Sequence, residues 1–192
     1  MLELIKKIRE RTGAGMVAVK NALNEAGGDE EKAIEILRKL GQSKAAKRAE
    51  KEAREGVVVS YVHPNNRVAS LVKLLCETDF VARNEEFVAL AKDIAMHVAA
   101  MNPKVVKPED VAADLVEKEK EIWREQLKNE NKPAEMIEKI MVGKEKKFRE
   151  ELALLTQSFV KNPEITVGDL IIEKIGKIGE NIQVGEISRI EL

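Results

Sequence analysis

Few residues in this chain have the types and the spacing that catalysis or metal binding requires. The 192 residues include one cysteine, Cys76, and two histidines, His63 and His97. A single cysteine excludes an intrachain disulfide and a metal site built from several cysteines. Neither histidine lies near a serine or cysteine nucleophile in the sequence, although folding could bring such groups together. We therefore expect no bound metal, no cofactor and no enzymatic activity.

The glycine pattern predicts turns rather than a nucleotide site. The sequence Gly13-Ala14-Gly15 lacks the preceding strand and the third glycine of a dinucleotide-binding fingerprint, so we expect a turn between helices there. Gly176 and Gly179 are typical of a helix end. The chain also contains no Gly-Lys-Ser/Thr sequence. We expect it to bind no nucleotide.

One short segment does suggest a binding role. Residues Thr78–Arg83 lie between a predicted strand and a predicted helix, and they place Phe80 beside Asp79. A phenylalanine in such a loop can present an apolar tip next to a charged acceptor, and aromatic anchors ringed by polar groups are typical of protein interfaces. The alternative is that Phe80 folds back and fills the core beneath the loop. The residues alone leave both interpretations open.

The composition limits the partners that can be expected. The chain is 44% hydrophobic, 35% charged and only 3% aromatic, which predicts a folded protein with an aliphatic core. Its 33 Lys and Arg residues nearly balance its 34 Asp and Glu residues, so no basic field favours nucleic acid or an anionic membrane. The amino terminus has no signal-peptide core, and no apolar run approaches the roughly 20 residues of a membrane span. We expect a cytoplasmic protein.

The first 42 residues are predicted to form three short helices. Apolar residues recur there at helical spacing, and Gly27-Gly28 and Gly41 are expected to end the second and third helices. Residues 43–55 are rich in Ala, Lys, Arg and Glu without a broad apolar face, which predicts a solvated helical linker. A nucleic-acid contact is the alternative there, but three glutamates interrupt the basic residues.

Residues 56–192 are predicted to form an α+β core domain. The β-branched run after Gly56 and a second apolar run, separated by His-Pro-Asn-Asn, indicate a hairpin, and the alternating carboxyl-terminal segment is expected to join it in a small antiparallel sheet. Asn84 is expected to cap a long helix that Pro103 closes. Stretches 110–129 and 134–159, separated by Asn-Glu-Asn-Lys-Pro, predict an antiparallel helical hairpin over about 110–160.

Three long stretches of the sequence resemble the elongation factor Ts family. They are IRERTGAGMVAVKNALNEAGGDEEKAIEILRKLG, CETDFVARNEEFVALAKDIAMHVAAMNP and PAEMIEKIMVGKEKKFREELALLTQSFVKNP. The resemblance implies a three-helix domain similar to ubiquitin-associated (UBA) domains over 1–42, a linker over 43–55 and the core domain over 56–192. It also implies a function, the exchange of guanine nucleotide on elongation factor Tu with displacement of Mg²⁺ and release of GDP.

The resemblance also assigns roles to individual residues. It implies that Phe80 enters a gap between two helices of the GTPase domain of elongation factor Tu. Asp79 would be its hydrogen-bonding companion, and Thr78 and Val81 would shape the loop. Contacts of the amino-terminal domain with another helix of that GTPase domain are implied for Arg9, Met16 and Val17. Several relatives have a second methionine where this chain has Val17.

Two other hypotheses and an assembly follow from the same patterns. A UBA-like module with a different partner explains the first 41 residues but leaves the segment TDFVARN, residues 78–84, without a role. An RNA-binding protein is disfavoured by the near-zero net charge and the lack of an aromatic stacking platform. Longer members of the family have a second core subdomain that this chain lacks. We therefore expect a homodimer in which a second copy supplies the missing half.

Overall fold

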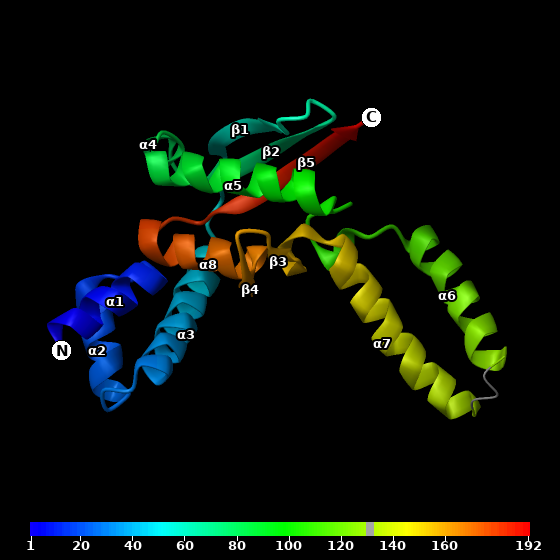
Figure 1. Ribbon diagram of the computed structural model, residues 1–192, viewed down its shortest axis with the longest axis horizontal. Helices are drawn as coiled ribbons and strands as arrows, with labels where there is room; N and C mark the ends of the chain where they lie inside the picture. Colours follow the sequence, from blue (N-terminus) through cyan, green and yellow to red (C-terminus); the bar gives the residue numbers. More distant parts are fainter. Residues whose placement is uncertain (130–132) are drawn as a thin grey trace. The chain divides into compact units, whose positions relative to one another are not determined.

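The computed structural model describes residues 1–129 and 133–192, which form the α+β fold predicted from the sequence (Figure 1). In chain order, the elements are α1 (Leu2–Thr12), α2 (Met16–Glu25), α3 (Glu30–Arg48), β1 (Glu55–Val62), β2 (Val68–Cys76), α4 (Asp79–Ala82), α5 (Glu85–Met101), the 3-10 helix η1 (Pro108–Asp110), α6 (Ala113–Asn129), α7 (Ala134–Leu152), the 3-10 helix η2 (Leu154–Thr156), β3 (Ser158–Phe159), β4 (Asn162–Thr166), α8 (Val167–Ile178) and β5 (Gln183–Glu191).

The chain forms two compact units. The first comprises Met1–Val59, Val72–Asp93 and Asp169–Gly185, and the second comprises Ser60–Leu71, Ile94–Gly168 and Glu186–Leu192. A three-stranded sheet has the strand order β1-β2-β5, and each of its strands contributes residues to both units. The short strands β3 and β4 pair with each other in antiparallel orientation. In the part of the chain that the structure describes, no helix is long and apolar enough to cross a membrane.

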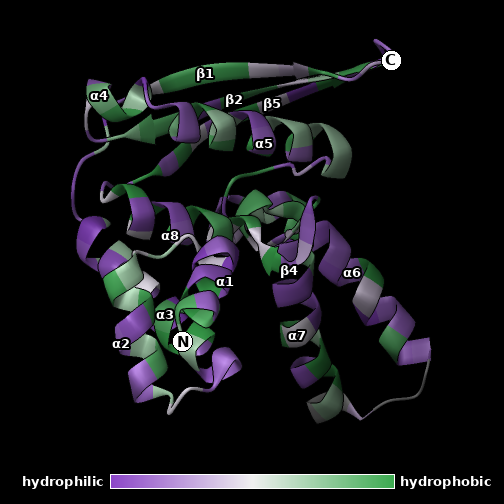
Figure 2. Ribbon diagram, turned by 60° about the vertical axis from the view of Figure 1, so that its left-hand side comes forward, coloured by the Kyte–Doolittle hydropathy of each residue, from purple (hydrophilic) through white to green (hydrophobic). Residues whose placement is uncertain are grey.

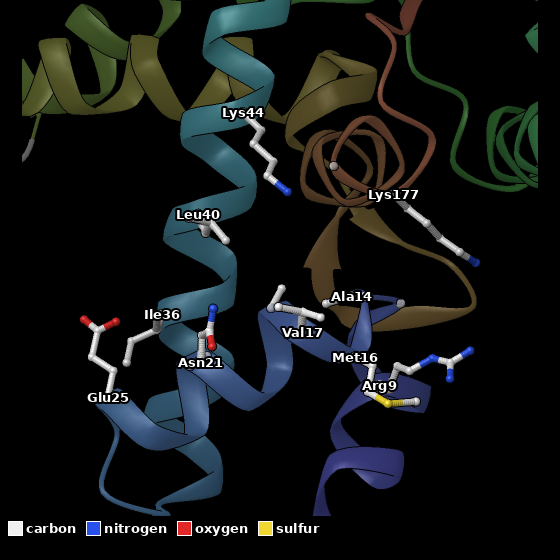
Figure 3. A pocket seen from close by; sticks show the side chains of 15 residues that line it. Arg9, Ala14, Met16, Val17, Asn21, Glu25, Ile36, Leu40, Lys44 and Lys177 are labelled. Carbon is white, nitrogen blue, oxygen red and sulfur yellow. The ribbon is translucent and has the colours of Figure 1, made fainter.

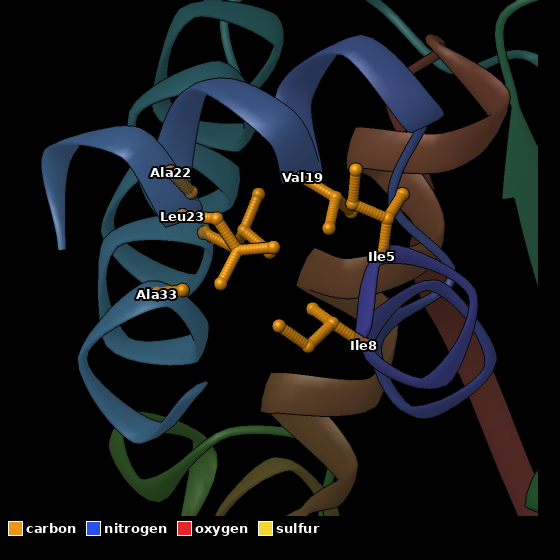
Figure 4. Packing of buried hydrophobic residues seen from close by; sticks show 7 residues of the cluster. Ile5, Ile8, Val19, Ala22, Leu23 and Ala33 are labelled. Carbon is orange, nitrogen blue, oxygen red and sulfur yellow. The ribbon is translucent and has the colours of Figure 1, made fainter. Parts of the chain in front are cut away.

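The amino-terminal part of the first unit is a small bundle of α1, α2 and α3. Its core contains Ile5 and Ile8 from α1, Val19 and Leu23 from α2, and Ala33 from α3, all of them buried (Figure 4). These residues recur every three or four positions, so each helix presents one apolar stripe to the others. The three predicted helices are therefore confirmed, while the likeness to UBA domains and the domain limits 1–42, 43–55 and 56–192 stay predictions.

Helix α3 is longer than the sequence pattern predicted. We expected it to end at Gly41, but it continues to Arg48 and includes the first part of the segment predicted as a separate linker. A glycine inside a helix costs only about 1 kcal/mol, and tertiary contacts offset that cost here. Ala45 is buried, and α3 and α8 approach closely where Gly41 lies beside Gly176. The chain then leaves the helix, and β1 begins at Glu55.

Helices α6 and α7 form the expected hairpin in the second unit. They lie side by side and run in opposite directions (Figure 1, Figure 2). Trp123 on α6 contacts Phe148 on α7 edge to face, with ring centroids 5.6 Å apart. Part of the predicted Asn-Glu-Asn-Lys-Pro connection, residues 130–132, lies outside the described residues. Helix α6 begins at Ala113, after η1, rather than near residue 110.

The second helix of this hairpin is shorter than predicted. We expected helix to residue 159, but α7 ends at Leu152 and η2 and β3 follow. The backbone N–H groups of Leu154 and Leu155 donate to the carbonyls of Val105 and Val106 instead of continuing the helical pattern. The Thr156 hydroxyl donates to a backbone carbonyl of α7, a local bond that competes with helix. Long-range backbone pairing therefore ends the helix early.

His97 on α5 is fully buried in the second unit. Its Nδ1 accepts a hydrogen bond from the Val160 N–H at 3.2 Å, and its Nε2 lies 3.1 Å from Oε1 of Gln157. These partners fit a neutral ring with its proton on Nε2. Burial lowers the pKa of His97, and the hydrogen bond to Gln157 partly opposes this. The folded protein therefore resists protonation of a group that is freely protonated in the unfolded chain.

We expect the free energy of unfolding to fall as pH decreases below about 6.5, the ordinary pKa of histidine. Below that pH the unfolded chain takes up a proton that folded His97 does not, so acid favours unfolding; above it the contribution is fully present. Urea unfolding at about pH 7.5 and about pH 5.5 tests this, because most carboxylates stay ionised over that interval. Between these two pH values, the His97→Gln variant should lose less free energy of unfolding than the wild-type chain. Equal losses in the two proteins would contradict the assignment of this pH dependence to His97.

Candidate functional site

The predicted binding segment is a single helical turn rather than a loop. Thr78 has extended backbone angles, φ −125° and ψ 155°, and its hydroxyl accepts a hydrogen bond from the Val81 N–H at 3.4 Å. Threonine is favoured at this capping position, which explains why one turn of helix, α4, begins at Asp79. Ala82 is buried and fixes the inner side of the turn, while Val81 is half-buried.

The side chain of Phe80 projects into solvent from this turn. It is 81% exposed, so the interpretation in which Phe80 fills the core is wrong. Beside it, Asp79 forms an ion pair of 3.0 Å with Arg83 one turn along; the Arg83 side chain is largely exposed and that of Asp79 about half exposed. An exposed aromatic ring next to a carboxylate that remains within reach of a partner is the arrangement expected of an interface anchor.

The base of the turn is anchored to β2 through Cys76. This residue is fully buried, and its thiol lies 3.2 Å from the Thr78 carbonyl oxygen, to which it can donate. Burial, with a contribution from the charge of Glu180, raises the pKa of the Cys76 thiol to about 11. The thiol therefore stays protonated near neutral pH, which agrees with a core residue rather than a nucleophile.

A second surface gathers the other predicted residues. Arg9 lies near the end of α1, and Met16 and Val17 open α2 after the Thr12–Gly15 turn. Met16 is 54% exposed and Val17 is 73% exposed, so both apolar side chains are available for contact. All three line one groove of about 870 Å³ (Figure 3).

The groove also includes residues that the sequence did not suggest. Leu40 and Lys44 from α3 line one side of it, and Lys177 from α8 lines the other (Figure 3). The lining thus combines apolar side chains with the cations of Arg9, Lys44 and Lys177, and Glu25 is its acidic member. An apolar floor with a mainly basic rim suits a partner helix that carries apolar and acidic side chains.

Both surfaces belong to the first unit. Among the side chains that the structure describes, no three of His, Cys, Asp or Glu come close enough together to hold a metal ion. The chemical resources of this unit are apolar contact, hydrogen bonding and charge. Proteins bind other macromolecules through interactions of these kinds.

The sequence of this chain was compared with those of known proteins, and it matches one family over most of its length. Residues 2–174 match the profile of the family described as elongation factor TS. The chain is 58% identical over 182 residues to elongation factor Ts of Thermosipho melanesiensis, covering 95% of this chain and 93% of that protein. It is 54% identical over 190 residues to elongation factor Ts of Fervidobacterium nodosum, covering 99% and 96%, and 54% identical to that of Carboxydothermus hydrogenoformans, covering 99% and 88%.

Proposed function

Because the chain belongs to the elongation factor Ts family and is a translation elongation factor, we propose that it acts as the guanine-nucleotide exchange factor of elongation factor Tu. It binds elongation factor Tu loaded with GDP, displaces Mg²⁺ and promotes release of GDP. It works in the cytoplasm, is not an enzyme, and binds neither nucleotide nor nucleic acid itself.

The exposed ring of Phe80 is the observation that carries this proposal. A GTPase holds GDP through backbone amides of its phosphate loop, a lysine and a bound Mg²⁺. Exchange needs only a protein that binds the distorted, metal-depleted state better than the closed one. Burying one phenylalanine side chain contributes roughly 2–3 kcal/mol, and each 1.4 kcal/mol is about tenfold in affinity. A ring that is 81% exposed in the free protein has nearly all of this free energy still available.

The groove at Arg9, Met16 and Val17 supplies the second contact. It binds another helix of the GTPase domain and keeps the exchange factor in place while the Thr78–Val81 turn inserts Phe80 into that domain. Its exposed apolar side chains and basic rim support this role, because they complement an amphipathic helix with acidic residues. Binding through two surfaces of one unit also raises the effective concentration of the turn at its target.

Release of a fluorescent GDP analogue from elongation factor Tu tests the proposal. We expect the chain to accelerate release strongly, and we expect excess free Mg²⁺ to oppose it because metal and factor compete through linked equilibria. A titration of the chain alone with the same analogue is the control and should show no saturable binding. Unchanged release from elongation factor Tu, or saturable binding of nucleotide to the chain itself, would defeat the proposal.

We propose further that the protein is a homodimer. In the second unit, Ser70 on β2 and Arg189 on β5 donate hydrogen bonds to the carbonyls of Ala95 and Ala99 on α5. Neighbouring residues of a strand face opposite sides, so Leu71 and Ile190 lie on the other face of the sheet. They are 47% and 70% exposed. A second copy of the chain, related by a twofold axis, covers this apolar face.

Sedimentation equilibrium over about a hundredfold range of concentration tests the dimer. We expect a mass of twice 21.5 kDa at the upper end, and no change with reductant because Cys76 is buried. Leu71→Lys combined with Ile190→Lys should shift the chain to monomer. Val142→Lys, at a 71% exposed position of α7, should leave the dimer intact. A wild-type mass of 21.5 kDa at every concentration would refute the dimer.

A further inference from the structure

The segment that follows α8 reaches back to the Thr78–Val81 turn. Helix α8 ends at Ile178, and Gly179 has φ 87°, in the left-handed region that favours glycine. This turn of the backbone brings Glu180 and Asn181 beside the end of β2, although Glu180 lies 102 positions after Thr78 in the sequence. The sequence pattern predicted a helix end at Gly176 and Gly179 and a strand after it, but no contact with the Thr78–Val81 turn.

The Glu180 carboxylate accepts three hydrogen bonds at the start of the turn. Its Oε2 accepts from the backbone N–H of Glu77 at 3.1 Å and from that of Thr78 at 3.0 Å. Its Oε1 accepts from the Thr78 hydroxyl at 2.6 Å. The same hydroxyl accepts from the Val81 N–H, so a continuous chain of bonds runs from Glu180 into the first turn of α4. Bonds to an ionised acceptor are the stronger kind.

Asn181 fixes the neighbouring part of the same junction. It is 2% exposed, and its backbone N–H donates to Oε1 of Glu77 at 2.6 Å. Its side-chain Nδ2 donates to the carbonyl of Lys51 at 2.6 Å, in the segment that follows α3. Arg48 adds an ion pair to Glu77 at 3.2 Å. A buried, fully bonded polar group of this kind specifies one local geometry.

We propose that Glu180 and Asn181 are positioning residues that hold the Thr78–Val81 turn in its binding geometry before a partner arrives. The inference rests on the proposed exchange function. A mobile turn would lose conformational entropy when its ring is buried, and that loss would consume part of the free energy that Phe80 contributes. The carboxylate of Glu180 removes this loss in advance by ordering the turn in the free protein.

Replacement of Glu180 separates positioning from general stability. We expect Glu180→Ala to slow factor-dependent GDP release by about tenfold or more, since displacement of a binding group by about 1 Å has effects of this order. Glu180→Gln should retain most of the activity, because its amide oxygen can accept from the two N–H groups and its amide N–H can donate to the Thr78 hydroxyl. Glu164→Ala, at an exposed position of β4, is the matched control.

A double-mutant cycle with Phe80→Ala gives a readout that a purely structural role would not move. If Glu180 acts through Phe80, Glu180→Ala should have little further effect on release once the ring is absent. Full additivity of the two substitutions would overturn the positioning role, and so would normal activity of Glu180→Ala. Hydrogen exchange at the Thr78 and Val81 amides should rise in Glu180→Ala and stay near wild type in Glu180→Gln; unchanged protection in the alanine variant would also overturn it.

Two further outcomes are decisive. If the wild-type chain does not accelerate GDP release, the proposed function is refuted, and the role of Glu180 and Asn181 in exchange is refuted with it. Rapid release by the wild type and by Glu180→Ala alike would refute only the positioning. If Glu180→Ala does not fold, substitutions of Thr78 provide a second test. Thr78→Val removes the hydroxyl that donates to Glu180, and Thr78→Ser keeps that hydroxyl. Loss of activity in the valine variant alone supports the proposal, and equal activity of the two overturns it.

Discussion

Replacement of Phe80 by alanine is expected to reduce the acceleration of GDP release about thirtyfold or more, the equivalent of burying one phenylalanine ring in a partner. The stability of the free protein should change by no more than about 0.5 kcal/mol, as is usual for surface substitutions. Both expectations follow from the 81% exposure of the side chain. Stopped-flow release of a fluorescent GDP analogue and urea unfolding measure the two quantities.

A graded series at this position sharpens the test. Phe80→Leu keeps an apolar side chain of smaller area and should fall between the wild type and Phe80→Ala in release rate. Val160→Ala, between β3 and β4 and 39% exposed, controls for the loss of an exposed apolar group elsewhere. A destabilisation of about 3–5 kcal/mol in Phe80→Ala would mean that the ring belongs to the core in solution. Full activity with unchanged stability would exclude Phe80 as the wedge.

The orientation of Phe80 could not be predicted from its own neighbourhood. The residues from Thr78 to Arg83 are compatible with a ring that points inward or outward, and the sequence left both open. In the structure, the turn that carries Phe80 is held by a hydrogen bond from the Thr78 hydroxyl to Glu180, a residue that lies 102 positions further along the chain. A local pattern carries no information about such a partner. By contrast, the capping role of Asn84 was predictable, because its Oδ1 accepts from the Glu86 N–H two residues away.

Helix boundaries show the same division between local and distant causes. The turn after α2 followed from Gly27-Gly28, whose positive φ angles, 63° and 89°, are a local property of glycine. The continuation of α3 through Gly41 depends on α8, which packs beside it at Gly176. The end of α7 at Leu152 depends on pairing with the carbonyls of Val105 and Val106. The two wrong boundaries, those of α3 and α7, arose where a tertiary contact outweighed the local helix propensity.

The groove illustrates which parts of a binding surface a sequence can indicate. Arg9, Met16 and Val17 were found through the resemblance of one continuous stretch, and the structure places them together. Leu40, Lys44 and Lys177 come from two other helices and carry no recognisable motif. A helix that bears apolar and basic residues is ordinarily a solvated helix with one buried face. Only the crossing of α2, α3 and α8 shows that these side chains line one surface.

Replacement of Phe87 by alanine should give the opposite result to replacement of Phe80. Phe87 is fully buried near the start of α5. Truncation of a buried phenylalanine removes its transfer free energy and leaves a cavity, so we expect a loss of about 3–5 kcal/mol in stability. For a chain of this size the melting temperature should fall by about 6–20 °C. Phe87→Leu, which fills part of the cavity, should lose less.

The activity of the folded Phe87→Ala protein should be affected much less than its stability. Its ring lies in the core and has no surface to present, so GDP release measured well below the melting temperature should stay within a few fold of the wild type, in contrast to the expected effect of Phe80→Ala. Differential scanning calorimetry and release assays on the same preparations make the comparison. A melting temperature within about 2 °C of the wild type would show that Phe87 is not a core residue. A loss of activity as large as that of Phe80→Ala at full folding would show that exchange depends on α5 itself, and not on one exposed ring.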